Sequence, residues 1–287
     1  MILFWIIINF LRNIYRRYIR WQWLLRLIKY LLNSSVNFYA ALKRFDFPAN
    51  YVWSQKLEMM RGQYEEETVH IIRQIIKPGM TVVDVGAHIG YYTRILAELV
   101  GAEGRVLAFE PEPENFSLLQ KNTQKFANVS LFNLAVSNQK REMPFYTAEK
   151  TGAHSTFKSA LRHKEIKVSA VRLDDWVSEY GHAMSVKIDF MKIDVEGGEP
   201  AVIDGALEIF EKNHDVKIVF EFNPENLRLA GADESDFLKK ISSLDFKIFL
   251  IKADGLKKLT ERQLNGLEPI AEPKGFVNLF GERPDKR

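Results

Sequence analysis

Short apolar runs alternate with amphipathic stretches along most of the chain, from about residue 63 onward. The run Thr81–Val85 has the length of a buried strand, and Tyr91–Val100 has helical spacing. The predicted strands are Thr81–Val85, Arg105–Phe109, Val129–Leu134, Val186–Ile193, Val216–Phe222, Phe246–Ile251 and Gly275–Phe280. The predicted helices are 63–76, Tyr91–Val100, Glu112–Phe126, Glu199–Phe210 and Asp233–Leu244. Such an order needs right-handed crossovers, so we expect an α/β fold, a mostly parallel sheet with helices on both faces.

The regular alternation pauses between about residues 138 and 185. Two shorter strands, Pro144–Ala148 and Ile166–Val171, are expected here around the polar loop 149–164. The acids Asp174 and Asp175 are typical of a helix cap. In parallel sheets, ligands bind beyond the carboxyl ends of the strands, near the point where the strand order reverses. Four acids lie at such predicted ends, namely Asp84, Glu110, Asp194 and Glu221.

The first 45 residues follow a different pattern. Arg12, Arg16 and Arg20 recur every fourth residue and line one face of a predicted amphipathic helix, which 33-NSS-35 would end. The apolar opening is shorter than the roughly twenty residues that span a bilayer, and it lacks the features of a secretory signal. We therefore expect residues 1–32 to contact the headgroup layer, on the cytoplasmic face of the cell membrane. The alternative is a helix that packs on the rest of the protein or on a second subunit.

Charge separates this leader from the remainder of the chain. The sequence has 40 basic and 37 acidic residues, and eight of the basic ones but no acid lie in residues 1–45, so the remainder is mildly acidic. Nucleic-acid binding needs a basic face, so we expect no nucleic-acid partner. The absence of cysteine excludes disulfides and thiolate metal sites. We predict a leader over 1–45 and one domain over 46–287, with 36–62 as a connecting or capping region.

The stretch 82-VVDVGAHIGYY-92 places a glycine-containing loop directly after a predicted strand. A phosphate-binding P-loop would need Lys followed by Ser or Thr, and a dinucleotide loop would need a middle glycine; both are missing. The carboxylate of Asp84 would repel a pyrophosphate but suits a ligand with an ammonium and a sulfonium, which is S-adenosylmethionine. Gly86 would allow close backbone approach, and the helix start at Gly90 and Tyr91 offers amides to the ligand's carboxylate.

Glu110 ends the next predicted strand, where its carboxylate can accept hydrogen bonds from both ribose hydroxyls. That role is shared with nicotinamide sites, so Glu110 supports a nucleoside without choosing between cofactors. The following strand end, from Asn133 to Val136, would border the adenine, and 64-YE-65 would touch the cofactor from outside. The predicted cofactor-binding residues are Asp84, Gly86, Ala87, Gly90, Tyr91, Glu110, Pro111, Asn133, Ala135, Tyr64 and Glu65.

Several motifs in this order resemble the FkbM family of S-adenosylmethionine-dependent methyltransferases over about residues 62–255. The matching pieces are 62-GQYEEE-67, 82-VVDVGAHIGYYT-93, 107-LAFEPEPENF-116, 134-LAVSN-138, 171-VRLDDW-176 and 191-MKIDVEGGE-199. The resemblance implies a Rossmann-like class I methyltransferase fold and O-methylation of hydroxyls on sugars, polyketides and related metabolites. The chain departs from the family pattern at His88, where Asn is usual; both residues can shape the turn.

The most concentrated chemistry outside the cofactor loop is 192-KIDVEGGE-199. Alternation would place Lys192, Asp194 and Glu196 on one side, facing the methyl acceptor. A structural explanation is also open, in which Lys192 pairs with Asp194 and Glu199 favours a helix start. The predicted catalytic residues are Asp194, Glu196, Lys192 and His154, and the predicted substrate residues are Glu221 and Ser155. Three carboxylates resemble a magnesium site, but no local spacing motif supports one, so no metal is predicted.

These features together predict an O-methyltransferase that uses S-adenosylmethionine. The expected acceptor is a small-molecule or glycan hydroxyl, on a sugar, a glycolipid or a polysaccharide precursor. One alternative is an NAD(P)-dependent oxidoreductase, against which Asp84 and the missing middle glycine argue. A second is a non-catalytic, membrane-associated binding module of the same fold.

Overall fold

The computed structural model describes residues 2–49, 51–148, 155, 162–181, 187–266, 268–270 and 275–284. The chain forms two compact units. One comprises Met1–Phe47 and Tyr51–Tyr64, and the other comprises Pro48–Asn50 and Glu65–Arg287. His154, a predicted catalytic residue, lies outside the described residues.

The N-terminal unit consists of two helices, α1 (Ile2–Leu42) and α2 (Trp53–Arg61). The predicted helix end at residues 33–35 was wrong, because these polar side chains are satisfied without breaking the helix. Ser35 Oγ donates to the carbonyl of Leu31, one turn back, and Asn33 accepts from Lys56 Nζ of α2. The predicted connecting region therefore contains the end of α1 and all of α2. None of the described helices has the length and apolar composition needed to cross a bilayer.

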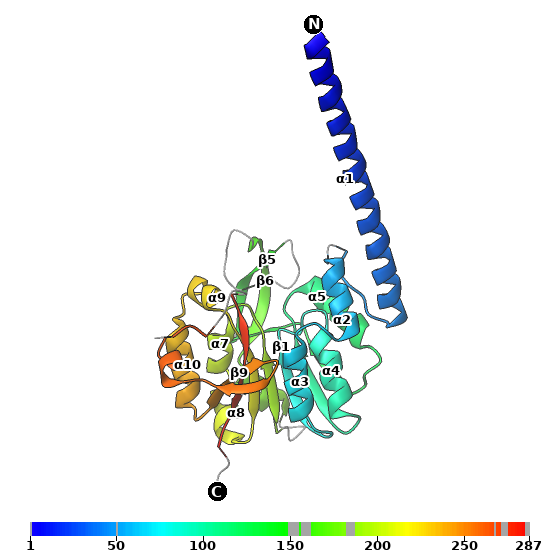
Figure 1. Ribbon diagram of the computed structural model, residues 1–287. Coiled ribbons are helices and arrows are strands. Elements are labelled where there is room, and N and C mark those ends of the chain that lie inside the picture. Colours follow the sequence, from blue (N-terminus) through cyan, green and yellow to red (C-terminus); the bar gives the residue numbers. More distant parts are fainter. Residues whose placement is uncertain are drawn as a thin grey trace. The chain divides into compact units, whose positions relative to one another are not determined.

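The larger unit is built on an eight-stranded, mostly parallel sheet, as predicted (Figure 1). The strands are β1 (Thr81–Val85), β2 (Arg105–Phe109), β3 (Val129–Phe132), β7 (Phe190–Ile193), β8 (Lys217–Phe222), β9 (Lys247–Lys252), β10 (Gly255–Lys258) and β11 (Val277–Glu282). Their order is β10-β9-β11-β8-β7-β1-β2-β3. The chain runs outward from β1 to β3 and then returns to β7 on the other side of β1, so the order reverses between β1 and β7. β11 runs antiparallel to both of its neighbours.

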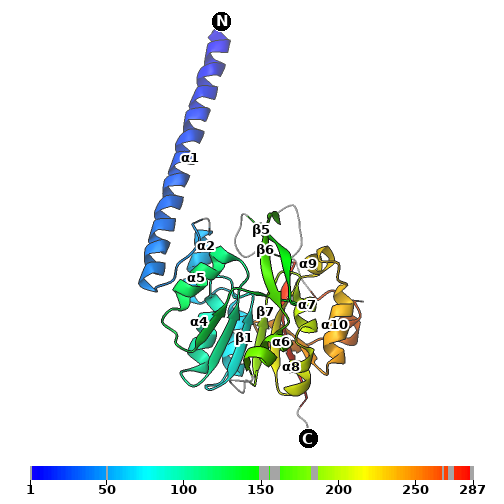
Figure 2. The ribbon, with the colours of Figure 1, turned by 180° about the vertical axis from the view of Figure 1, so that it is seen from behind.

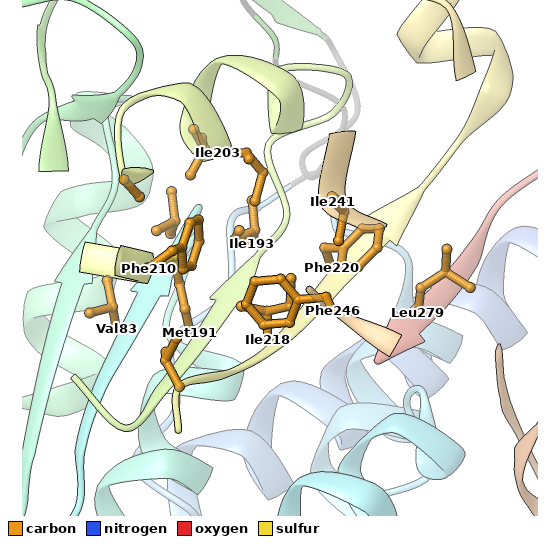
Figure 3. Packing of buried hydrophobic residues seen from close by; sticks show 14 of the residues in the cluster. Val83, Met191, Ile193, Ile203, Phe210, Ile218, Phe220, Ile241, Phe246 and Leu279 are labelled. Carbon is orange, nitrogen blue, oxygen red and sulfur yellow. The ribbon is translucent and has the colours of Figure 1, made fainter. Parts of the chain in front are cut away.

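Helices cover both faces of this sheet, as the two opposite views in Figures 1 and 2 show. They are α3 (Glu66–Ile75), α4 (Tyr91–Val100), α5 (Pro113–Thr123), α6 (Leu173–Trp176), α7 (Glu199–Asp204), α8 (Leu207–Lys212), α9 (Pro224–Leu229), α10 (Glu234–Ser243) and α11 (Glu261–Leu264). Val83 of β1 belongs to the main core cluster, with Phe210 of α8 and Ile241 of α10 (Figure 3). Strand alternation turns Asp84 to the opposite face, where Thr93 of α4 donates to it. The two helical layers therefore follow directly from the alternation in β1.

The segment predicted as one helix over Glu199–Phe210 is two helices, α7 and α8, separated at Gly205. A Cβ at Gly205 would lie 2.1 Å from the carbonyl oxygen of Ser137, so this close approach requires glycine. Asp174 lies inside α6 and does not cap it. Its carboxylate instead accepts from the backbone N–H groups of Glu208 and Ile209 at the start of α8, at 3.1 and 3.0 Å.

A small second sheet fills the pause in the alternation. Its strands are β4 (Ala135–Val136), β5 (Arg141–Ala148) and β6 (Arg162–Val171), in the order β4-β6-β5. The two strands predicted here correspond to β5 and β6, which are both longer than expected. Ser155, within the predicted polar loop, pairs with Tyr146 of β5 through backbone hydrogen bonds in both directions.

Candidate functional site

The loop between β1 and α4 is held in a left-handed conformation at Gly86, His88 and Gly90, with φ of 83°, 50° and 90°. His88 donates its N–H to Glu110 Oε2 at 2.9 Å, so its observed role agrees with shaping the turn. The N–H groups of Gly86 and Ala87 both donate to the carbonyl of Phe109. The end of β1 is thus tied to the end of β2 by backbone groups.

Packing within the protein gives a further reason for glycine at position 86, and its close approach to the cofactor stays a prediction. A Cβ on Gly86 would lie 1.9 Å from the carbonyl oxygen of Asp194, at the end of β7. A Cβ on Gly90 would lie 2.9 Å from Leu119 of α5. Gly86 is therefore required by close packing against backbone, whereas Gly90 meets only the end of a flexible side chain. The positive φ favours glycine at both positions.

Glu110 is buried, and N–H groups from its surroundings hold its carboxylate. Oε1 accepts from the backbone of Glu112 at 3.0 Å and from Asn115 Nδ2 at 3.4 Å, while Oε2 accepts from His88. Burial raises the pKa of Glu110 to about 7, although these donors oppose the rise. Asn133 Nδ2 donates to the carbonyls of Glu110 and Pro111, so it supports the same corner.

Asp84 and Lys192 lie side by side in register on adjacent strands β1 and β7. Asp84 is fully buried, and Thr93 Oγ1 donates to its Oδ2 at 2.7 Å. Its other oxygen, Oδ1, is buried and makes no hydrogen bond within the described part of the chain. Burial raises the pKa of Asp84, and nearby Lys192 opposes that rise. A buried carboxylate oxygen without a donor fits a site for a positively charged ligand.

Lys192 is almost completely buried among acids. Its Nζ donates to Asp194 Oδ2 at 2.9 Å and lies 4.3 Å from the centroid of the Tyr92 ring. Burial alone would lower the pKa of Lys192, but the carboxylates of Asp194, Asp84 and Glu65 raise it above its usual value. Lys192 is therefore a fixed positive charge, and the pairing considered from the sequence is present.

Glu65 precedes α3 in a left-handed conformation, with φ of 46°. Tyr92 OH and Asn278 Nδ2 both donate to its Oε2, at 2.8 Å each. Burial raises the pKa of Glu65, Asp194 raises it further, and Lys192 lowers it.

Tyr91 is also buried, and burial together with the nearby Glu65 raises the pKa of Tyr91 to about 12. Tyr64 belongs to the N-terminal unit, so its contact with a cofactor stays a prediction.

Asp194, Glu196 and Glu221, here called the acidic cluster, come together at the ends of β7 and β8. One carboxylate oxygen from each lies within 4.8 Å of the others. Glu196 has a left-handed φ of 53°, and its Oε2 accepts from Asn226 Nδ2 at 2.5 Å. Ser155 Oγ donates to the carbonyl of Glu196 at 2.7 Å, so Ser155, a predicted substrate residue, helps to hold the backbone of Glu196 in place.

Glu199 stands next to the acidic cluster at the first turn of α7. It accepts from the backbone N–H groups of Val195 and Gly197, at 3.0 and 2.9 Å. Burial raises the pKa of Glu199 to about 7, against these hydrogen bonds. The carboxylate thus stabilises the turn at the helix start, which is the structural role considered from the sequence.

The sequence did not predict five side chains that contact the acids of this region, namely Tyr92, Thr93, Asn115, Asn226 and Asn278. Thr93 could have been predicted, because a polar residue in the first turn of a helix can face the end of the strand that precedes the helix. Asn278 could not, because it lies directly opposite Glu221 only through the antiparallel register of β11 and β8. Ala135, expected at the adenine, is buried in β4.

A separate cavity of about 510 Å³ lies between β3 and the small sheet. Its lining residues are Phe132, Leu134, Lys140, Arg141, Ser169, Ala170, Val171, Asp175, Trp176 and Glu179. Leu134 belongs to the segment from Asn133 to Val136 that was predicted to border the adenine, and the cavity contains none of the other predicted site residues.

Methyltransferases are among the known proteins that are similar to this chain. A family model described as the methyltransferase FkbM domain matches residues 84–248, more than half of the chain. Methyltransferase 1 from Beauveria bassiana is 29% identical over 146 residues, which are 43% of this chain and 57% of that protein. Protein-L-isoaspartate O-methyltransferase 1 from Arabidopsis thaliana is 39% identical over 59 residues, which are 21% of this chain and 26% of that protein. The match thus spans less than two thirds of either relative.

Among solved structures, a SAM-dependent O-methyltransferase from Thermotoga maritima is similar to this chain with a TM-score of 0.44. It is 15% identical, and the match covers 80% of this chain and 71% of that one.

Proposed function

The chain belongs to the FkbM methyltransferase family and uses S-adenosylmethionine; from this premise we propose that it methylates a hydroxyl of a sugar, a glycolipid or a polysaccharide precursor. Family membership removes the nicotinamide alternative. The observation that carries the proposal is the acidic cluster beside the buried Lys192–Asp194 pair, at the point where the strand order reverses.

We assign the cofactor to the ends of β1 and β2. The donor-free oxygen of Asp84 and the surrounding carboxylates fit a ligand that carries positive charge. Glu110 would accept from the ribose hydroxyls, since a carboxylate held by N–H groups still has free lone pairs. Asn133 and Pro111 would support the adenine side of the same corner. When bound, S-adenosylmethionine supplies a methyl group that is activated for in-line attack.

The acidic cluster favours a neutral, hydroxyl-bearing acceptor. Carboxylates accept hydrogen bonds from hydroxyl groups, and they repel phosphates and nucleic acids. Asp194 or Glu196 would accept the proton that the hydroxyl loses as the new bond forms. Lys192 stays protonated and cannot be the base, so we assign it the role of holding Asp194 in place.

Methyl transfer from isotope-labelled S-adenosylmethionine to fractionated host glycans and glycolipids tests this function. We expect a product that gains one methyl group and survives mild base, because a methyl ether is stable where a methyl ester hydrolyses. Asp194→Asn should lower the turnover rate by a factor of about 100 to 10,000 if this carboxylate acts as the base. Glu208→Gln, on the exposed face of α8, is the matched control and should transfer normally.

Base-labile methylation would contradict the choice of a hydroxyl acceptor. A chain that binds S-adenosylhomocysteine but methylates nothing in any fraction would favour the non-catalytic binding module instead.

We further propose that residues 1–32 attach the protein to the cytoplasmic face of an anionic membrane. Support comes from α1, whose large apolar side chains are exposed over its described part. They are Trp21, Trp23, Leu24, Leu25, Leu27, Ile28, Tyr30, Leu31, Leu32, Phe38 and Leu42. Basic residues without acids and interfacial aromatic side chains suit the headgroup layer of anionic lipids.

Co-sedimentation of the full chain with phosphatidylglycerol vesicles and with phosphatidylcholine vesicles tests the attachment. The double substitution Arg26→Glu and Lys29→Glu should weaken binding to the anionic vesicles by tenfold or more, at about 1 kcal/mol for each removed basic residue. Lys257→Glu with Lys258→Glu is the matched control, because it makes the same charge change on exposed residues of the larger unit. Equal loss in both variants, or no binding by the wild type, would leave the alternative that α1 packs on protein.

A further inference from the structure

We propose that Asp194, Glu196 and Glu221 form a binding site for a divalent cation of the Mg²⁺ or Mn²⁺ type. This departs from the sequence, which showed no metal-spacing motif. The ligand atoms come from the ends of two strands, β7 and β8, that are adjacent only in the folded sheet. One oxygen of each residue lies within 4.8 Å of the others. Two oxygens bound to one Mg²⁺ at about 2.0–2.1 Å are at most about 4.2 Å apart, so a small movement of the side chains brings the three atoms to one ion.

Glu221 provides the second, independent observation. Its side chain is 9% exposed, and its Oε1 is fully buried without a hydrogen-bond partner among the described residues. A buried ionised carboxylate without a partner is costly, and the usual remedies are a positive partner or a metal ion. The orphaned carboxylate faces the other two acids of the cluster, so it is directed at the proposed site.

The neighbouring carboxylates do have partners, which makes Glu221 an exception. Asp194 accepts from Lys192, and Glu196 accepts from Asn226. Glu199 accepts from two backbone N–H groups, and Glu65 accepts from a tyrosine and an asparagine. The positive charge of Lys192 is therefore already directed at Asp194. An additional cation would balance the acids that remain.

Neighbouring residues hold the acidic side chains of the cluster in position. Glu196 is held by Asn226 through its carboxylate and by Ser155 through its carbonyl. Such supporting contacts orient the ligands of a metal ion. Asp194 can bind the cation and Lys192 together, because a carboxylate has about four lone-pair positions. Three carboxylates leave positions of an octahedral ion open for water or for substrate oxygens. That an acceptor hydroxyl takes one of them rests on the proposed function.

Isothermal titration of the chelator-treated, full-length protein with Mn²⁺ tests the site without any acceptor. We expect saturable binding of one ion, weakened tenfold or more in Glu221→Gln. The control Glu208→Gln also removes one carboxylate, from the exposed face of α8, and should bind like the wild type. Wild-type protein without saturable binding would overturn the proposal. So would Glu221→Gln that binds as tightly as the wild type, which would mean that Glu221 is simply protonated or awaits a basic ligand.

A second variant guards against loss of folding. Thermal melting in chelator shows whether Glu221→Gln is folded. If it is not, Glu196→Gln replaces it, because Glu196 is partly exposed. Weakened Mn²⁺ binding by this variant supports the site, and unchanged binding overturns it. Failure to methylate any hydroxyl would count against the proposed function and would leave the binding result untouched.

Discussion

Two acidic regions share one edge of the sheet but are built in different ways. The cofactor rim, defined here as residues 84–90 with Glu110, is held by hydrogen bonds from nearby backbone. The acidic cluster is assembled from strand ends, and Glu221 Oε1 there is buried without a hydrogen-bond partner among the described residues. Glu110 and Glu221 are both buried, yet three N–H groups face the first, whereas four carboxylates raise the pKa of the second beyond the effect of burial.

This difference shows how far each region is satisfied without a ligand. The loop backbone and Glu110 have partners within the protein, so the cofactor rim can keep its shape before the cofactor arrives, although Asp84 Oδ1 has no donor among the described residues. The acidic cluster concentrates negative charge, so its lowest free energy requires a proton, a cation or a hydroxyl-bearing ligand. The two regions meet where Gly86 touches the carbonyl of Asp194.

The largest expected effect comes from breaking that contact. Gly86→Ala places a Cβ against the carbonyl of Asp194 and strains a φ of 83°, so we expect a loss of about 3–5 kcal/mol of unfolding free energy. Urea unfolding measures it. Gly79→Ala is the control, with a φ of 84° but nothing within 4 Å of its Cβ, and should lose only about 1–2 kcal/mol. Equal losses would show that the contact with Asp194 contributes nothing.

Removal of Glu110, the proposed acceptor for the ribose hydroxyls, should affect only the cofactor rim. Glu110→Ala loses two hydrogen bonds to a charged group, at about 1.5–3 kcal/mol each, so S-adenosylhomocysteine should bind about 100-fold more weakly or worse. Calorimetry measures the affinity. Glu114→Ala, at an exposed residue in the first turn of α5, is the matched control and should bind normally. Mn²⁺ binding by Glu110→Ala should be retained if the two regions are independent.

The pH dependence of cofactor binding distinguishes the two regions further. Burial raises the pKa of Glu110 to about 7, and we proposed that its ionised form accepts from the ribose, so affinity should fall as pH falls. We expect S-adenosylhomocysteine to bind about tenfold more weakly at pH 6 than at pH 8. Glu110→Gln cannot titrate and should show a flat profile. An unchanged wild-type affinity over this range would contradict the assignment.

The stability of the ligand-free protein should change in the opposite direction. The pKa of Glu110 is higher in the folded than in the unfolded protein, so protonated Glu110 contributes to the unfolding free energy. This contribution is fully present below pH 4.5 and is lost as pH rises through about 7.

The smallest expected effect is the change in unfolding free energy when a glutamate in each region is replaced by glutamine. In chelator at pH 8, Glu221→Gln should raise the unfolding free energy by about 1 kcal/mol, because it removes an unpartnered buried charge. Glu110→Gln should lower it by about 1–3 kcal/mol, because an amide N–H₂ would face N–H donors. Thermal melting measures both. A lower melting temperature for Glu221→Gln would mean that its carboxylate is already satisfied.

Much of the cofactor rim followed from the sequence alone. The bounds of β1, α4 and β2 agree with the prediction residue for residue, because apolar period and glycine positions are local signals. The loop chemistry around Asp84 also predicted the cofactor. The errors fell where distant partners decide the outcome. The end of α1 was misplaced because Asn33 binds Lys56, and one helix was split because Gly205 contacts Ser137.

The acidic cluster shows what only the tertiary structure decided. The sequence placed Asp194, Glu196 and Glu221 at strand ends and allowed them to be considered together, but their approach to within 4.8 Å depends on the parallel register of β7 and β8. Asn278 reaches Glu65 from 213 residues away, because β11 inserts antiparallel beside β8. Local patterns determine which elements form and which face each strand buries. Glu110 and Glu199 receive donors that are close to them in the sequence. Only packing supplies the donors of Glu65 and Glu196, because Asn278 and Asn226 come from remote parts of the chain.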